Sequence, residues 1–164
     1  MRIGVISDTH IPERAQSIPT KVIKGLKECE VILHAGDLVE LKVLDILRDI
    51  TDQVVAVYGN MDYPAVKKRL PSKQIIELEN LRIGLFHGWG SPHQLMDIVR
   101  DVFKSEKVDI IIFGHSHYPI NEDIEGIRYF NPGSPTDKVF SPFNSYGILE
   151  IEKKKIKKAE IVKI

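Results

Sequence analysis

The sequence predicts an α/β protein in which a mainly parallel sheet is followed by antiparallel strands. Short apolar runs at residues 2–6, 31–34 and 53–58 each end in a polar or glycine-bearing tip, and amphipathic segments separate them. This alternation is typical of strand–helix–strand crossover units. A chain of 164 residues can bury a sizeable core, so we expect residues 1–164 to form a single domain.

Two helices are expected between the first three apolar runs. Apolar residues recur at helical spacing over 22–26 and again over 41–47. A fourth strand is expected at 82–87, followed by a helix from about residue 92 to 104 and a fifth strand at 109–113. The crossover pattern therefore continues to Gly114.

The remainder of the chain has a different pattern of apolar and polar residues. The runs at 118–124, 127–132, 145–152 and 155–164 are short, are broken by Gly, Pro and Asn, and alternate partly with period two. No helical stretch is present among them, so we expect antiparallel strands. An exposed edge of such a sheet could pair two copies of the chain, which makes a homodimer possible.

Composition and charge narrow the function classes. The 23 basic residues balance 23 acidic ones, so broad binding to nucleic acid or to an anionic membrane is not expected. No apolar stretch approaches the ~20 residues of a membrane helix. The chain opens directly on an apolar strand and Cys29 is its single cysteine, so no disulfide within the chain and a cytoplasmic location are expected.

Polar side chains with metal-binding capacity follow five of the predicted strands. In open α/β folds the carboxyl ends of the strands are where ligands bind, so these tips should meet. They supply three oxygen donors and four imidazoles: Asp8, His10, Asp37, Asn60, His87, His115 and His117.

The spacing and chemistry of these donors predict a metal site. Asp8 and His10 are two residues apart, so in extended chain their side chains leave the same face, and "HSH" repeats that spacing. Carboxylate, amide and imidazole donors without thiolate favour Mn, Fe, Ni or Zn. Seven donors suit two ions, and two ions about 3.5–4 Å apart can share a hydroxide that attacks phosphate esters.

Each motif taken alone has an ordinary structural explanation. Asp or His after a strand commonly caps a turn or helix, and Gly with Asp or Asn is usual turn chemistry. "GHSH" alone could be a pair of solvent-facing histidines. Five such tips in order, each after an apolar run, favour a shared site over five separate turns.

Together the motifs Asp-x-His, Gly-Asp, Gly-Asn, a lone His and Gly-His-x-His resemble those of the calcineurin-like binuclear metallophosphoesterases. The size and "GNMD" are similar to the small phosphodiesterases related to the retromer subunit of the same fold. The resemblance implies a four-layer αββα sandwich of two mixed β-sheets flanked by helices. It places Asp8, His10 and His117 on one metal, Asn60, His87 and His115 on the other, and Asp37 between them.

One position departs from the family pattern. Many relatives carry a histidine directly after Gly-Asn that can protonate the leaving group, whereas this chain has Met61. Loss of a general acid typically costs 10²–10⁴-fold, and least for a good leaving group. Diesters with aryl leaving groups are therefore expected to be cleaved better than alkyl monoesters.

Two further residues near the predicted site, Asp62 and Trp89, have two interpretations each. Asp62 either accepts a hydrogen bond from a ligand imidazole or caps the following turn. Trp89, between two glycines, either packs over its loop or lines the substrate pocket. His34 is expected to be packed or hydrogen-bonded, and Ser134 in "NPGSP" to be structural.

We therefore expect a metal-dependent phosphodiesterase acting on small phosphate esters, with Asp37 and Asn60 in catalytic roles and two divalent ions, Mn first and Ni, Fe or Zn as alternatives. The competing hypothesis is a protein-interaction scaffold of the same fold with vestigial metal binding, because fold alone does not determine function. A nucleotide-binding Rossmann module is ranked last, since neither glycine-rich phosphate loop occurs.

Overall fold

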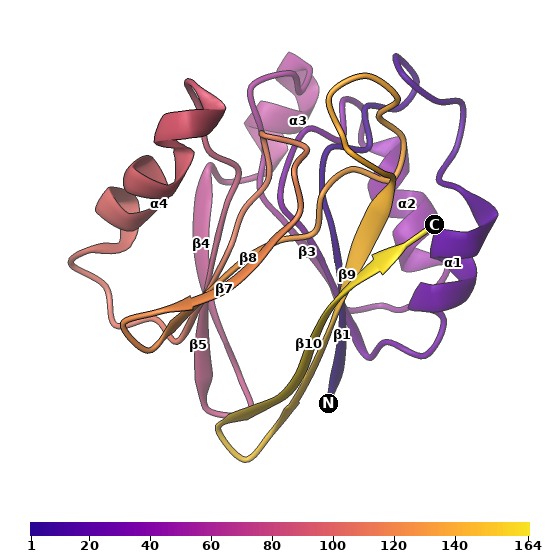
Figure 1. The fold of residues 1–164 in the computed structure, drawn as a ribbon. Helices are drawn as coiled ribbons and strands as arrows, with labels where there is room; N and C mark the ends of the chain where they lie inside the picture. Colours follow the sequence, from indigo (N-terminus) through magenta and orange to yellow (C-terminus); the bar gives the residue numbers. More distant parts are fainter.

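Two five-stranded mixed sheets form the centre of the computed structural model, which describes residues 1–164 (Figure 1). The first sheet has the order β10-β9-β1-β2-β3 and the second has the order β4-β5-β6-β8-β7. The strands of the first sheet are β1 (Arg2–Ile6), β2 (Val31–His34), β3 (Val54–Ala56), β9 (Ser145–Glu152) and β10 (Lys155–Lys163). Those of the second are β4 (Lys73–Leu78), β5 (Leu81–Phe86), β6 (Ile110–Ile112), β7 (Ile120–Ile124) and β8 (Ile127–Asn131).

The helices cover the outer faces of the two sheets. Helices α1 (Thr20–Leu26), α2 (Lys42–Arg48) and α3 (Pro64–Arg69) lie on the side of the first sheet, and α4 (Leu95–Phe103) covers the second (Figure 1). None of these helices is long and apolar enough to span a membrane. The predicted αββα sandwich of two mixed sheets is thus confirmed.

Three apolar clusters hold the layers together because successive strand residues point to opposite faces. Ile3 and Val5 of β1 pack between the two sheets, whereas Ile6 faces α1 and α2. A third cluster lies between the second sheet and α4 and includes Phe103. Burial on both sides of β1 explains why that strand is apolar throughout.

Most of the predicted elements are present. β1 pairs in parallel with β2, β2 with β3, and β5 with β6, as the crossover pattern indicated. The expected helix at 92–104 is a 3₁₀ turn, Pro92–Gln94, followed by α4. The later strands pair antiparallel as β7–β8, β1–β9 and β9–β10, but β8 also pairs in parallel with β6. That parallel pair departs from the expectation of purely antiparallel pairing.

Candidate metal centre

The structure brings all seven predicted donors together where the carboxyl ends of the parallel strands of both sheets meet. The first sheet contributes four donors and the second sheet three. Asp8 and His10 follow β1, Asp37 follows β2, Asn60 follows β3, His87 follows β5, and His115 and His117 follow β6. The site therefore spans the junction between the two sheets.

One group of donors consists of three buried side chains, Asp8, His10 and His117. Asp8 Oδ1 lies 3.2 Å from His117 Nε2 and 3.8 Å from His10 Nε2. The two Nε2 atoms are 3.1 Å apart. A carboxylate oxygen and two imidazole nitrogens that converge in this way have the right chemistry to hold one divalent cation.

A second group gathers around Asn60 Oδ1, which lies 3.2 Å from His87 Nε2 and 3.0 Å from His115 Nδ1. Asp37 connects the two groups, because its Oδ2 is 3.2 Å from His87 Nε2 and 3.7 Å from His10 Nε2. The Met61 backbone N–H donates to Asp37 Oδ1 over 2.7 Å, which orients Oδ2 toward both groups. This position is compatible with a bridging carboxylate.

The surroundings of Asp8 favour a cation at this site. Its Oδ2 accepts hydrogen bonds from Ser7 Oγ and the His115 backbone N–H, whereas its buried Oδ1 has no hydrogen-bond partner. Leaving a buried acceptor unsatisfied costs about 1–3 kcal/mol. A divalent metal ion would satisfy this oxygen, so the donor set fits the ions that the fold family implies.

The charged side chains of the site shift one another's pKa values. Burial alone would raise the pKa of Asp8, but the charge of His87 and contacts with His10 and His117 hold it well below its usual value. Burial would lower the pKa of His87, yet Asp8 and Asp37 raise it to about 9. Because the pKa of His87 is raised, a metal ion must compete with a proton for this imidazole, and metal affinity should fall in acid.

The ligand loops do not have the extended conformation that the spacing suggested. Left-handed φ angles occur at Asp8 (53°), His10 (44°), Asp37 (55°), His115 (70°) and His117 (57°). The extended-chain prediction for the two pairs is therefore wrong. Non-glycine residues adopt this region rarely, and strain of this kind is concentrated at functional sites. The turns also send His115 and His117 to different donor groups.

Asp62 supports the loops and contacts no imidazole. It is buried, and its Oδ2 accepts hydrogen bonds from the backbone N–H groups of Asp37 (3.1 Å) and Gly59 (2.7 Å). Burial raises its pKa, partly offset by the backbone donors. The proposed bond to a ligand imidazole is absent because the carboxylate is used to join the loops that follow β2 and β3.

Asp137 was not identified from the sequence but holds a ligand in place. Its Oδ2 lies 2.6 Å from His117 Nδ1, and its Oδ1 accepts a hydrogen bond from Arg14 over 2.8 Å. Burial alone would raise the pKa of Asp137, but His117 and nearby backbone N–H groups lower it to about 2. The carboxylate thus keeps a proton on Nδ1 and leaves Nε2 directed at Asp8.

Replacing Asp137 with alanine is expected to weaken metal binding roughly 10- to 100-fold, because an imidazole that loses its carboxylate partner loses its fixed orientation. Competition of Zn²⁺ between the protein and a chromophoric chelator measures this change. Asp101→Ala, at an exposed carboxylate paired with Lys104, is the control. Equal affinities of wild type and Asp137→Ala would show that His117 needs no such partner.

The side chains of His34 and Ser134 form hydrogen bonds with the backbone around the site. His34 is buried; its Nδ1 accepts the Gly36 N–H, so Nε2 carries the proton toward Thr9 Oγ1, 3.1 Å away. Ser134 Oγ donates to the Asp8 carbonyl over 2.7 Å. Both expectations, a hydrogen-bonded His34 and a structural Ser134, are confirmed.

We expect His34 to make the metal-free protein sensitive to mild acid. Burial lowers its pKa from 6.5 to about 3, so between these values the unfolded chain binds a proton that the folded chain does not. The free energy of unfolding should therefore decrease as pH falls, by roughly 2 kcal/mol from pH 6.5 to 4.5. Urea unfolding at pH 7 and pH 4.5 measures it. His34→Gln should lose this component, and parallel pH curves for both proteins would contradict the assignment.

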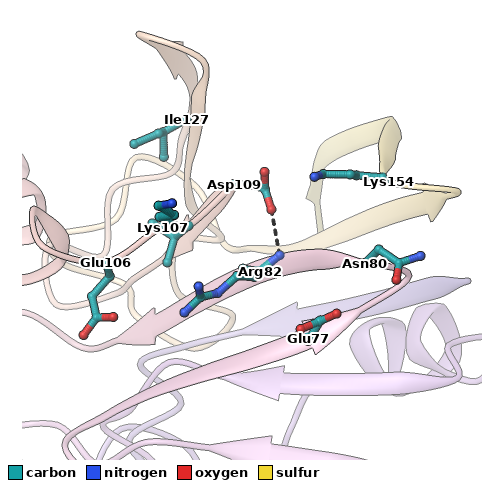
Figure 2. Close-up of a pocket in the computed structure, with 9 residues that line it drawn as sticks. Glu77, Asn80, Arg82, Glu106, Lys107, Asp109, Ile127 and Lys154 are labelled. Carbon is teal, nitrogen blue, oxygen red and sulfur yellow. Dashed lines mark hydrogen bonds between the residues drawn. The ribbon is translucent and has the colours of Figure 1, made fainter.

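Cavity size does not by itself identify the site. The largest cavity, about 670 Å³, lies at the opposite end of the second sheet and includes Arg82, Lys107, Asp109 and Lys154 (Figure 2). Its charges are of both signs, and Asp109 accepts the Arg82 backbone N–H over 2.8 Å. None of the predicted donors lines it. The cavity over the donors is smaller, about 260 Å³.

The cavity over the donors has an open, partly aromatic rim. Its lining residues include Arg14, Met61 and Phe140 beside five of the donors. The Arg14 guanidinium lies 5.5 Å from the centre of the Phe140 ring. Arg14 is the only Lys or Arg among the lining residues. Its guanidinium is therefore the permanent positive charge that an anionic substrate would meet in this cavity. Sequence reasoning missed Arg14 because one arginine in a loop carries no pattern.

Comparison with known proteins gives the family. The model of the calcineurin-like phosphoesterase superfamily domain matches residues 1–154, and the chain belongs to that superfamily. A probable metallophosphoesterase of Methanocaldococcus jannaschii is 40% identical over 145 residues, which cover 83% of this chain and 69% of that protein. A phosphodiesterase of the same organism is 29% identical, covering 94% and 95% of the two chains.

Solved structures agree with this assignment. Vps29 of Entamoeba histolytica, determined in complex with Zn²⁺, has a TM-score of 0.78 and 27% identity over 100% of this chain and 98% of that one. This likeness agrees with the fold and the family that the motifs indicated. The chain is thus a member of a phosphoesterase superfamily with candidate ligands for divalent metal ions.

Proposed function

We propose that this chain is a binuclear metal-dependent phosphodiesterase that prefers diesters to monoesters. The observation that carries the proposal is the position of Asp37 Oδ2 between two converging donor groups, 3.2 Å from His87 and 3.7 Å from His10. When bound, two divalent ions would supply a hydroxide nucleophile at neutral pH and a clamp for a phosphoryl oxygen. Manganese is the ion that we propose first.

The residues of the chain prepare this chemistry. Asp137 orients His117, and the Met61 N–H orients Asp37, so the donors need little rearrangement on binding. Asn60 directs its carbonyl oxygen toward two imidazoles, which leaves its amide N–H groups to stabilise charge on a phosphoryl oxygen. Arg14, in the same cavity, would bind the remaining anionic oxygen.

The expectation that aryl diesters are cleaved better than alkyl monoesters rests on Met61. Its side chain is 45% exposed and lines the cavity beside His115, at the position where many relatives carry an acid. A thioether cannot donate a proton. The substrate must therefore supply a leaving group that departs without one, as an aryl diester does.

Hydrolysis of bis-p-nitrophenyl phosphate and p-nitrophenyl phosphate tests the proposal directly. We expect activity to vanish after chelation, to return with Mn²⁺, and to favour the diester. A requirement for metal with equal rates on the two esters would contradict the preference. Turnover that survives exhaustive chelation would contradict the metal mechanism.

The structural similarity to Vps29 favours one competing function, a protein-interaction scaffold that retains metal sites. The same experiment separates the two. Bound metal with neither ester cleaved over a range of pH and metals would favour the scaffold. We further propose that residues 1–164 act as one domain in the cytoplasm; sedimentation at micromolar concentration would determine whether two copies associate.

A further inference from the structure

A second cavity adjoins the candidate metal centre, and Arg14 is not among its lining residues. It has a volume of about 400 Å³, and it shares Asn60 with the cavity over the donors. Three aromatic side chains contribute to its wall, those of Tyr58, Phe86 and Trp89. His87, a candidate ligand, also lines it. A group bound here would therefore lie next to the candidate centre.

Trp89 is held in an exposed position by its loop. Its flanking glycines have left-handed φ angles, 104° at Gly88 and 78° at Gly90, which other residues rarely adopt. The Gly90 carbonyl lies 2.8 Å from His115 Nε2, so the loop is fixed to a candidate ligand. The indole packs edge-on against Phe86 at 5.2 Å between ring centres, yet 52% of the residue is exposed.

An indole with this exposure is suited to recognition. A large apolar side chain that is half exposed gives up burial that would stabilise the fold. Trp89 nevertheless keeps an accessible surface over a cavity that Tyr58 and Phe86 also line. Both interpretations of Trp89 from the sequence therefore apply, because the side chain packs on its loop and lines a pocket.

We propose that the cavity under Trp89 is a subsite for a planar aromatic group, such as a nucleobase, on one ester arm of the substrate. The inference rests on the proposed phosphodiesterase function and narrows its substrate class. A phosphodiester has two arms on one phosphorus, and the two cavities that share Asn60 could provide one compartment for each arm. Lys67 lines the same cavity and adds a positive charge that favours an anionic ligand.

Trp89 is the only tryptophan in the chain, so its fluorescence reports directly on this cavity. The protein loaded with Zn²⁺ is titrated with adenosine 5′-monophosphate and, separately, with ribose 5-phosphate, which has the same phosphate but no base. We expect saturable quenching by the nucleotide and none by the sugar phosphate. No response to the nucleotide, or equal responses to the two compounds, would overturn the proposal.

Affinity measurements by calorimetry give an independent test. Stacking of a base on an aromatic side chain predicts that Trp89→Ala weakens adenosine 5′-monophosphate binding roughly 5- to 100-fold, whereas Trp89→Phe retains most of it. Ribose 5-phosphate affinity should not change in either variant. Tyr118→Ala, at an aromatic residue that is 57% exposed and lines neither cavity, is the control. Unchanged nucleotide affinity in Trp89→Ala would overturn the proposal.

Neither test requires turnover, so the subsite and the proposed function can fail separately. Quenching of Trp89 fluorescence by the nucleotide, without hydrolysis of any ester, would support the subsite and contradict the catalytic role. Metal-dependent diester hydrolysis without a change in Trp89 fluorescence would support the enzymatic function and contradict the subsite.

Discussion

Asp37→Asn is expected to lower turnover of bis-p-nitrophenyl phosphate by roughly 10³-fold and to remove bound metal. The substitution keeps the shape of the side chain but removes the charge on the oxygen that lies between His10 and His87. Metal ions contribute several kcal/mol of transition-state stabilisation, and each 1.36 kcal/mol is about tenfold in rate. Steady-state kinetics and metal analysis of the purified protein measure the two effects.

The control for Asp37 is Asp45→Asn, which removes a carboxylate that is 74% exposed on α2 and is not among the donors. It should retain metal content and turnover. The free energy of unfolding of both variants separates loss of metal from loss of fold. If Asp37→Asn retained a full complement of metal and normal turnover, the proposed bridging role of Asp37 would be wrong.

Met61→His is expected to raise hydrolysis of alkyl phosphate monoesters by roughly 10²-fold or more, the gain that a well-placed general acid provides. The new imidazole would lie in the cavity with His115, at an exposed position without left-handed backbone, so it requires little repacking. Activity on bis-p-nitrophenyl phosphate should change little, because p-nitrophenolate leaves without protonation.

The pH dependence of Met61→His distinguishes a general acid from an altered shape. Monoesterase activity should acquire a decrease at alkaline pH as the new imidazole loses its proton. Met61→Leu is the matched control and should resemble wild type. An equal gain in both variants would indicate relief of crowding, and no gain in Met61→His would show that another residue limits monoester hydrolysis.

The sequence predicted the order of the central elements well because their signals are local. Apolar runs such as 110–112 are buried on both faces and stand out against polar tips. Helix α3 and strand β4 were not predicted for the opposite reason. Only Val66 of α3 is buried, and β4 is an edge strand without a fully buried residue, so neither has a strong apolar pattern.

Within the candidate site, the sequence predicted which residues meet, but it did not predict the backbone conformation of the loops that carry them. Each donor follows an apolar run, which places it at the sheet edge. The left-handed turns at Asp8 and His115 leave no mark in the sequence, because neither residue is a glycine. Asp137 lies 20 residues beyond His117 in a loop, and only the folded chain shows that the two side chains meet.

Because the donors are divided between the two sheets, metal ions bound to them would also stabilise the packing of one sheet on the other. Asp37 and Asn60 follow strands of the first sheet and His87 follows a strand of the second, so an ion held among them would cross-link two layers that also share an apolar interface. Metal binding and docking of the layers are then thermodynamically coupled. A chelator would then destabilise the whole sandwich, because removal of the ions from the candidate metal centre would remove a link between its two sheets.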